Sequence, residues 1–343
     1  MSGAGGGGAM TSTLSEMPLL SITSPETVEL CKSLPLQDGD VFICSYPKSG
    51  TTWTQHIVLS LLMRHRRNKA AAAAAVESSS PPAEPLKYDH VSDYAPFYEV
   101  DRHWNVEHRD LIDSIRENHD RLGRRVFNTH LRWDMLPRSS PDASTYDGAK
   151  RNAKFIYLVR SPLDVCVSFY YHLSHQEEGR YTGTFDEFFR EWIRGKIAFG
   201  SWIDHVLSYA PSLSSSRDDV LFVSYEEMLS DTRTTATALA KFLSARVSDS
   251  DLDEMLPTFS FASMKSDLDK FRPRSVAWRN DFQFLRRGVS GDSRTAADDE
   301  QRGMWRERLE REDFEGRLRC ILKADDERDD DGDALEKILG LLS

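Results

Sequence analysis

Residues 40–67 constrain the fold of this 343-residue chain more than any other segment. The apolar run over 41–44 is typical of a buried strand, and after Trp53 apolar residues recur with a helical period. Between the two lies the turn Tyr46-Pro47-Lys48-Ser49-Gly50-Thr51-Thr52. A strand that passes into a helix through such a turn leaves several N–H groups unpaired at the positive end of the helix dipole. The sequence therefore predicts an anion-binding site at this turn.

The turn is not the common phosphate loop Gly-x-x-x-x-Gly-Lys-Ser/Thr, because Lys48 precedes Gly50 and no earlier glycine opens the loop. The string Tyr-Pro-Lys-Ser-Gly-Thr-Thr-Trp instead resembles the 5′-phosphosulfate loop of the cytosolic sulfotransferases at every position. This resemblance implies that 3′-phosphoadenosine 5′-phosphosulfate is the co-substrate. Its binding residues here would be Lys48, Ser49, Gly50, Thr51, Thr52 and Trp53.

A second predicted strand ends at Thr129-His130. A single His is more often structural, but Thr-His-Leu followed by Leu136-Pro137 resembles the catalytic-His segment of the same family. The resemblance implies that His130 is the general base and that Lys48 stabilises the leaving phosphate. Imidazole suits this role because its usual pKa leaves it mostly neutral near pH 7. Animal members commonly carry Lys where this chain has Asn128, so that second cation is absent.

A third predicted strand, over 154–159, ends at Arg160, and Ser168 would lie two turns into the next helix. An Arg at the carboxyl end of a parallel strand lies where α/β folds bind ligands. The spacing Arg-x-x-x-Asp-x-x-Val-Ser resembles the second nucleotide segment of the family, which implies that Arg160 and Ser168 bind the 3′-phosphate. Other resemblances assign the adenine region to Tyr225, Ser260, Phe261 and Met264, with Trp53 and Phe261 on the base, and the 3′-phosphate to Arg286, Arg287 and Gly288.

The last family signature matches only in its first half. Ser293 and Ala297 stand where the family has Trp and Phe, which predicts a looser lid over the nucleotide.

The family's dimerisation pattern should fall around Val276 and is not matched, so no oligomeric state is predicted. The aromatic segment 88–104 fits core packing and an apolar acceptor pocket, and the two interpretations are compatible.

Composition narrows the partners and the compartment. A net charge of −11 opposes binding to nucleic acid or other polyanions. The four cysteines are scattered without a Cys-x-x-Cys pair, which favours a reducing compartment and predicts no metal site. The sequence has neither an apolar run of about 18 residues nor a signal-peptide pattern. We therefore expect a cytoplasmic protein whose partner is a small molecule, with no nucleic acid and no membrane.

Predicted strands near residues 40, 125, 155 and 220 alternate with helices, which is typical of an α/β fold. We expect one domain over 26–320, in which a central parallel sheet has helices on both faces, like the P-loop nucleotide kinases. Outside it we expect a disordered leader over 1–25 and an acidic C-terminal tail over 321–343. A low-complexity insertion is expected at about 68–86.

The sequence thus predicts a sulfotransferase that moves a sulfuryl group from 3′-phosphoadenosine 5′-phosphosulfate to a hydroxyl of a small acceptor, an amine being the less favoured acceptor group. Two alternatives remain: a nucleotide-binding homologue without turnover, and a small-molecule kinase of related fold. Retention of Lys48 and His130 opposes the first, and the position of the loop lysine opposes the second.

Overall fold

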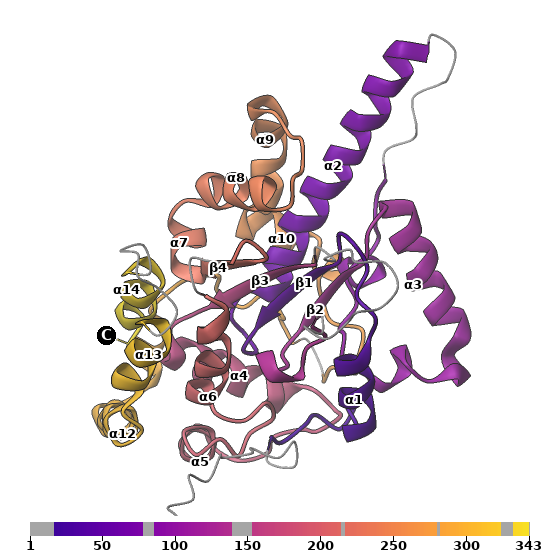
Figure 1. Cartoon of the computed structure of the whole chain (residues 1–343). Helices are drawn as coiled ribbons and strands as arrows, with labels where there is room; N and C mark the ends of the chain where they lie inside the picture. Colours follow the sequence, from indigo (N-terminus) through magenta and orange to yellow (C-terminus); the bar gives the residue numbers. More distant parts are fainter. Residues whose placement is uncertain are drawn as a thin grey trace, which may run out of the picture.

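A four-stranded parallel sheet lies at the centre of the protein (Figure 1). The computed structural model describes residues 17–77, 86–138, 153–213, 217–279, 282–323 and 332–342. The strand order is β2-β1-β3-β4. The strands are β1 (Val41–Ser45), β2 (Val126–Thr129), β3 (Lys154–Val159) and β4 (Val220–Ser224). All four predicted strands and the parallel arrangement are confirmed.

Side chains of the strands alternate between two hydrophobic cores, one on each face of the sheet. In β1, Val41 and Ile43 belong to one core, whereas Phe42 and Cys44 belong to the other. All of these side chains are completely buried. Because helices cover both faces, the strand has no polar face, which explains why its sequence is a continuous apolar run.

Helices cover both faces, as predicted, and Figure 1 shows them around the sheet. The core that contains Val41 is closed by α2 (Thr51–Glu77), α3 (Arg109–Leu122), α7 (Tyr225–Ser230), α8 (Thr232–Phe242), α9 (Asp249–Met255) and α10 (Phe261–Ser266). The core that contains Phe42 is closed by α1 (Pro25–Ser33), α4 (Pro162–His175), α5 (Phe185–Trp192), α6 (Trp202–Tyr209), α12 (Asp299–Arg311), α13 (Phe314–Lys323) and α14 (Gly332–Gly340).

The remaining elements are short. The four-residue helix α11 (Ser293–Ala296) contacts α4. The 3₁₀ turns are η2 (Val91–Asp93), η3 (Asp101–His103), η4 (Val106–His108), η5 (Trp133–Met135), η6 (Ala210–Ser212), η7 (Leu256–Phe259) and η8 (Leu268–Lys270).

The N-terminal segment differs from the expected disordered leader over 1–25. Residues 1–16 lie outside the described residues, but Met17, Leu19 and Leu20 pack against the core. Thr23 is buried and its hydroxyl donates a hydrogen bond of 2.7 Å to the carbonyl of Glu99. A short apolar sequence, Met-Pro-Leu-Leu, is enough to order this part of the chain once a core is available.

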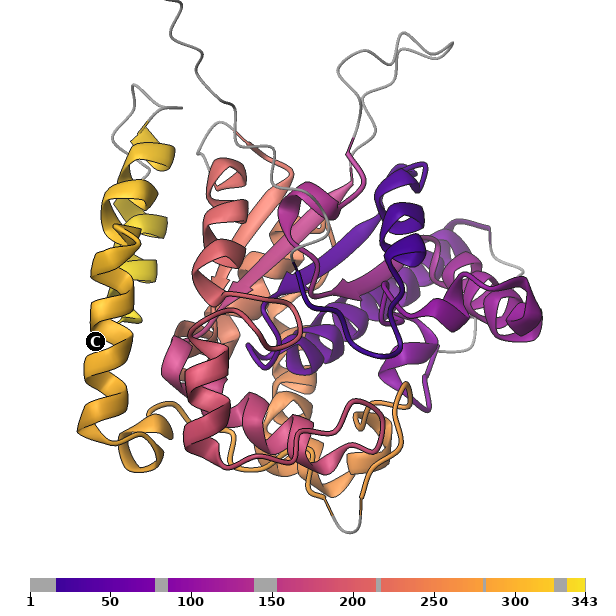
Figure 2. The ribbon, with the colours of Figure 1, turned by 90° about the horizontal axis from the view of Figure 1, so that it is seen from below.

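The C-terminal segment differs from the expected acidic tail over 321–343. The acidic stretch itself falls within 324–331, outside the described residues, but α14 follows it and buries Leu335, Ile338 and Leu341. Figure 2 shows the C-terminal helices along one side of the molecule beside α6. The domain therefore extends beyond residue 320, because an apolar face at helical spacing outweighs the charge that precedes it.

The Ala-rich part of the expected insertion, over 70–77, continues α2 to Glu77, and the Ser/Pro-rich part at 78–85 lies outside the described residues. Among the helices that the structure describes, none is long and apolar enough to cross a membrane. The described residues also contain no group of three His, Cys, Asp or Glu side chains that could hold a metal ion.

If α14 belongs to the folded domain, removing its buried side chain should destabilise the whole protein. We expect Ile338→Ala to lower the free energy of unfolding by about 2 to 5 kcal/mol, the usual cost of such a cavity. Chemical denaturation followed by tryptophan fluorescence measures this change. Glu336→Ala, on the exposed side of the same helix, is the matched control. Equal stability of the two variants would contradict the packing of α14.

Candidate active site

A cavity of about 620 Å³ opens at the carboxyl ends of the strands. The residues that follow each strand line it: Lys48 after β1, His130 after β2, Arg160 after β3 and Tyr225 after β4. This edge is where parallel α/β sheets bind ligands. Of the predicted site residues, only Ser49 does not line the cavity. The others do: Lys48, Gly50, Thr51, Thr52, Trp53, His130, Arg160, Ser168, Tyr225, Ser260, Phe261, Met264, Arg286, Arg287 and Gly288. Ser49 belongs to the same turn but is completely buried.

The turn after β1 has the backbone conformation that an anion seat needs. Lys48 and Gly50 have positive φ angles of 71° and 102°. A Cβ at Gly50 would lie 2.7 Å from Cδ2 of Tyr225, so only glycine fits there. In the described parts of the chain, the amides of Gly50, Thr51 and Thr52 have no acceptor, and α2 begins at Thr51. These amides can bind an anion at the start of a helix.

Lys48 reaches into the cavity from this turn. Its Nζ lies 3.1 Å from Nδ1 of His172 and 4.5 Å from the ring centre of Phe284. Burial, with the positive charges of Arg160 and Arg286, lowers the pKa of Lys48 to about 7. Because nearby negative charge favours the protonated amine, an anion in the cavity would raise this pKa again.

One ring nitrogen of His130, Nδ1, is hydrogen-bonded, and the other, Nε2, makes no hydrogen bond to a described residue. Nδ1 lies 2.8 Å from the carbonyl oxygen of Ser45, so Nδ1 carries the proton and donates it, leaving Nε2 as an acceptor. The main-chain N–H of His130 donates to Oε1 of Glu99 over 2.6 Å. Burial lowers the pKa of His130 to about 4. The ring is therefore neutral near pH 7, as a general base must be.

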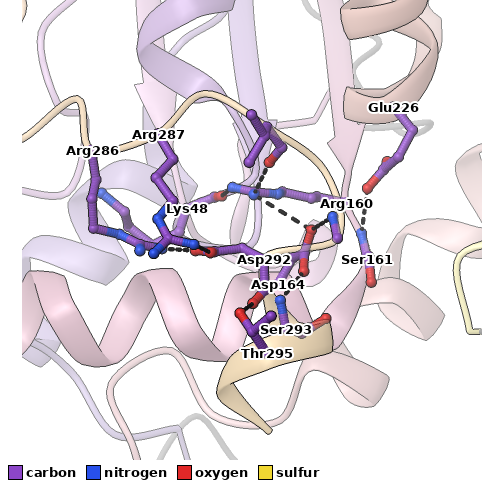
Figure 3. A network of polar contacts seen from close by, with 12 residues as sticks. Lys48, Arg160, Ser161, Asp164, Glu226, Arg286, Arg287, Asp292, Ser293 and Thr295 are labelled. Carbon is purple, nitrogen blue, oxygen red and sulfur yellow. Dashed lines mark hydrogen bonds and ion pairs between the residues drawn. The ribbon is translucent and has the colours of Figure 1, made fainter.

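Arg160 and Asp164 join the segment 289–293 to the sheet (Figure 3). The guanidinium of Arg160 donates to the carbonyls of Lys48 and Val289, at 3.2 and 3.1 Å. The Asp164 carboxylate accepts from the amides of Gly291 and Ser293, at 2.7 and 2.8 Å. Ser293 and Ala297 are both buried. The segment is thus anchored through its backbone, at the place where the family's aromatic side chains are missing.

Two further cations share one buried carboxylate in Figure 3. Both Arg286 and Arg287 are paired with Asp292, and the Arg287–Asp292 distance is 2.5 Å. Asp292 is buried, whereas 57% of the Arg287 side chain is exposed. Two guanidinium groups held by one carboxylate leave a net positive charge beside the cavity. An anion can therefore bind to them without separating a one-to-one ion pair.

Aromatic side chains line another part of the cavity. The ring of Phe261 lies against the backbone of Gly288, where a Cβ would approach it to 2.2 Å. The rings of Trp53 and Tyr225 pack edge to face with their centres 5.9 Å apart. Flat apolar walls of this kind suit a planar heterocycle. Gly288 is thus required by close packing in addition to its positive φ of 64°.

The aromatic segment 88–104 divides between the two roles expected of it. Phe97 lines the cavity, with its ring centre 5.3 Å from that of His130. By contrast Tyr88, Tyr94 and Tyr98 are buried in the cores.

Sequence reasoning missed three functional neighbours. His172 lines the cavity one helical turn after Ser168, so the i, i+4 spacing could have found it. Asp164 is the Asp of the Arg-x-x-x-Asp motif, but the motif did not predict that it anchors the segment 289–293. Asp292 follows the arginine pair within the same short segment, but only the fold shows that its carboxylate turns back to them.

A family model described as the sulfotransferase domain matches residues 38–312. Sulfotransferase 1E1 of Mus musculus is 30% identical over 270 residues, which cover 78% of this chain and 80% of that protein. Luciferin sulfotransferase of Photinus pyralis is 30% identical over 248 residues, covering 72% of this chain and 62% of that protein.

Solved structures share the fold. One is a mouse sulfotransferase, SULT7A1, complexed with 3′-phosphoadenosine 5′-phosphate (PAP). It superposes with a TM-score of 0.60 at 24% identity, and the match covers 92% of this chain and 95% of that one. A retinol dehydratase in complex with androsterone and PAP also gives a TM-score of 0.60, at 21% identity, covering 83% of this chain and 84% of that one.

The environment of His130 predicts an unusual titration. Because burial lowers its pKa to about 4, the ring should stay neutral as the pH falls from 8 to about 5 and gain its proton only below that. ¹⁵N imidazole shifts should show the proton on Nδ1 throughout. The spectrum of a His130→Asn variant identifies the signal. Protonation near the ordinary value of about 6.5, or a proton on Nε2, would contradict this geometry.

Proposed function

This chain belongs to the sulfotransferase family, and from that premise we propose that its cavity transfers a sulfuryl group from 3′-phosphoadenosine 5′-phosphosulfate to a hydroxyl of a small acceptor. The observation that carries the proposal is that two features meet at one sheet edge: a turn whose amides can bind an anion, and a neutral histidine whose Nε2 makes no hydrogen bond to a described residue. The first can hold the donor's sulfated phosphate and the second can accept the proton of the acceptor.

The described residues fit the donor nucleotide at three places. The amides of Gly50, Thr51 and Thr52, which have no acceptor among the described residues, and the Lys48 ammonium suit the 5′-phosphosulfate. Trp53 and Phe261 offer flat apolar surfaces for adenine. Arg286 and Arg287 share one carboxylate and can bind the 3′-phosphate together with Ser168.

Arg160 has a second role besides the one that the sequence implies. Its guanidinium already donates to the carbonyls of Lys48 and Val289 and lies 4.3 Å from the ring centre of Tyr225. We infer that it fixes the shape of the 3′-phosphate site as well as contributing charge to it.

The donor supplies an activated sulfuryl group, and the residues of this chain direct its transfer. Nε2 of His130 takes the proton of the acceptor hydroxyl while the acceptor oxygen forms a bond to sulfur. The bond between sulfur and the 5′-phosphate oxygen breaks, and its electron pair stays on that oxygen. Lys48 and the amides of the turn stabilise the negative charge that develops there. The products are the sulfated acceptor and 3′-phosphoadenosine 5′-phosphate (PAP).

The two alternative functions receive less support from the site. A small-molecule kinase would need a Lys after the last loop glycine, whereas Lys48 precedes Gly50. A homologue without turnover was suggested by Ser293 and Ala297. That reason weakens because Asp164 anchors the same segment through the amides of Gly291 and Ser293.

We further propose that the protein works in the cytoplasm, on a small molecule and without nucleic acid. Cys31, Cys44 and Cys166 are buried free thiols, and Cys320 is an exposed one. Free thiols of this kind persist in a reducing compartment. The net charge of −11 opposes a polyanionic partner.

Replacing the proposed base tests this mechanism. We expect His130→Ala to lower turnover about 100- to 10,000-fold, the usual contribution of a positioned base, while PAP binding stays within about threefold of wild type. Turnover is measured from PAP release and binding by calorimetry. His108→Ala, at an exposed position on η4, is the control. Near-normal turnover of His130→Ala would contradict the assignment of the base.

A further inference from the structure

The cavity extends beyond His130 along a wall that the nucleotide residues do not form. Its lining here includes Leu20, Phe97, Arg102, Leu111, Ile115 and Phe199. Phe97 and Phe199 each place a ring centre 5.3 Å from that of His130. The carbonyl of Phe97 accepts a hydrogen bond of 2.6 Å from Nδ1 of His103, the residue next to Arg102. Arg102 therefore belongs to the same part of the lining as Phe97, away from the nucleotide residues.

Arg102 is a cation that has no partner among the described residues. Its guanidinium makes no hydrogen bond, ion pair or ring contact with any residue that the structure describes, although it is half-buried and its Nε is fully enclosed. Other arginines of the cavity are engaged: Arg274 with Asp93, and Arg286 and Arg287 with Asp292. The two terminal nitrogens of the guanidinium are not enclosed and make no hydrogen bond to the described residues, so they can donate to a ligand that supplies acceptors.

The nearby carboxylates are committed elsewhere. Oδ1 of Asp101, the preceding residue, accepts from the amide and the hydroxyl of Ser24, at 2.7 and 2.9 Å. Oδ2 of Asp93 accepts from the amide of His90 at 2.8 Å, and Oδ1 of Asp93 faces Arg274. Burial lowers the pKa of His103 to about 4, so its ring is neutral and adds no second charge. Among the described residues at this end of the cavity, Arg102 is thus a basic side chain that no carboxylate contacts, whereas Arg274 is paired with Asp93.

We propose that the acceptor carries a carboxylate, which Arg102 binds while the acceptor's hydroxyl lies at His130. A planar guanidinium can hold both oxygens of a carboxylate, and one cation matches one negative charge. Phe97, Phe199, Leu111 and Ile115 would pack against the carbon skeleton between the two polar ends. The inference rests on the proposed sulfuryl transfer and specifies its substrate class: hydroxy acids with an apolar body.

Matched pairs of acceptors test this inference. We would use ω-(4-hydroxyphenyl)alkanoic acids of increasing chain length, from 4-hydroxybenzoic acid upward, each beside its methyl ester. For the best chain length, kcat/KM should be about 10- to 100-fold higher for the acid than for the ester, the range for a charge-assisted hydrogen bond. Arg102→Met should remove this preference by raising KM for the acid while kcat changes little, and Arg102→Lys should restore part of it.

The control variant makes the same Arg→Met change outside the cavity. Arg116 lies on an exposed part of α3, outside the cavity lining. The variant Arg116→Met should therefore keep the wild-type preference for the acid over the ester. Equal kcat/KM for acid and ester in the wild-type protein, or an unchanged preference in Arg102→Met, would overturn the inference.

A binding measurement separates this inference from the proposed function. The corresponding ω-phenylalkanoates, which lack the hydroxyl, should bind to the wild-type protein about tenfold or more tightly than to Arg102→Met in calorimetry. If no phenol is sulfated but this difference is found, sulfuryl transfer fails and the carboxylate site stands. If the phenols are sulfated and the difference is absent, only the carboxylate site fails.

Discussion

The site depends on the turn between β1 and α2, whose backbone amides have no acceptor among the described residues. The positive φ angles at Lys48 and Gly50 create this turn, and its neighbours pack on it. Tyr225 fills the space where Gly50 lacks a Cβ, Arg160 binds the carbonyl of Lys48, and His130 binds that of Ser45. The turn therefore seats an anion and also fixes the positions of the base and of the nucleotide residues after the other strands.

Two buried carboxylates, those of Asp164 and Asp292, hold the segment that brings basic side chains to the cavity. The chain as a whole carries a net charge of −11, yet several basic side chains line the cavity, among them Lys48, Arg160, Arg286 and Arg287. Asp164 and Asp292 hold the segment that carries the arginine pair, through backbone amides and through the guanidinium groups. These carboxylates limit the repulsion among the cations but leave an excess of positive charge for a ligand with two phosphate groups.

The strands and the loop residues could be predicted because each depends on its own local sequence. The run over 41–44 needs only burial on both faces, and the positive φ of Gly50 belongs to its own turn, although the close contact with Tyr225 does not. The ordered residues 17–25 and α14 could not, because Met17 and Ile338 gain their stability from a core built by distant segments. Asp292 and Arg102 illustrate the same limit in the site. Whether a charged side chain has a partner depends on which residues the fold brings beside it, and the sequence alone does not give the distances between them.

Incubation of the protein with a donor that carries ³⁴S in its sulfuryl group, and with a panel of phenols and alcohols, is the most direct measurement of the central claim. Mass spectrometry should show at least one acceptor heavier by one labelled sulfuryl group, together with an equal amount of PAP. This result requires that one donor and one acceptor meet on the protein, which is the reaction that the turn and His130 are proposed to direct. Acceptors that remain unlabelled throughout the panel, or that gain a phosphoryl group from ATP instead, would contradict the account.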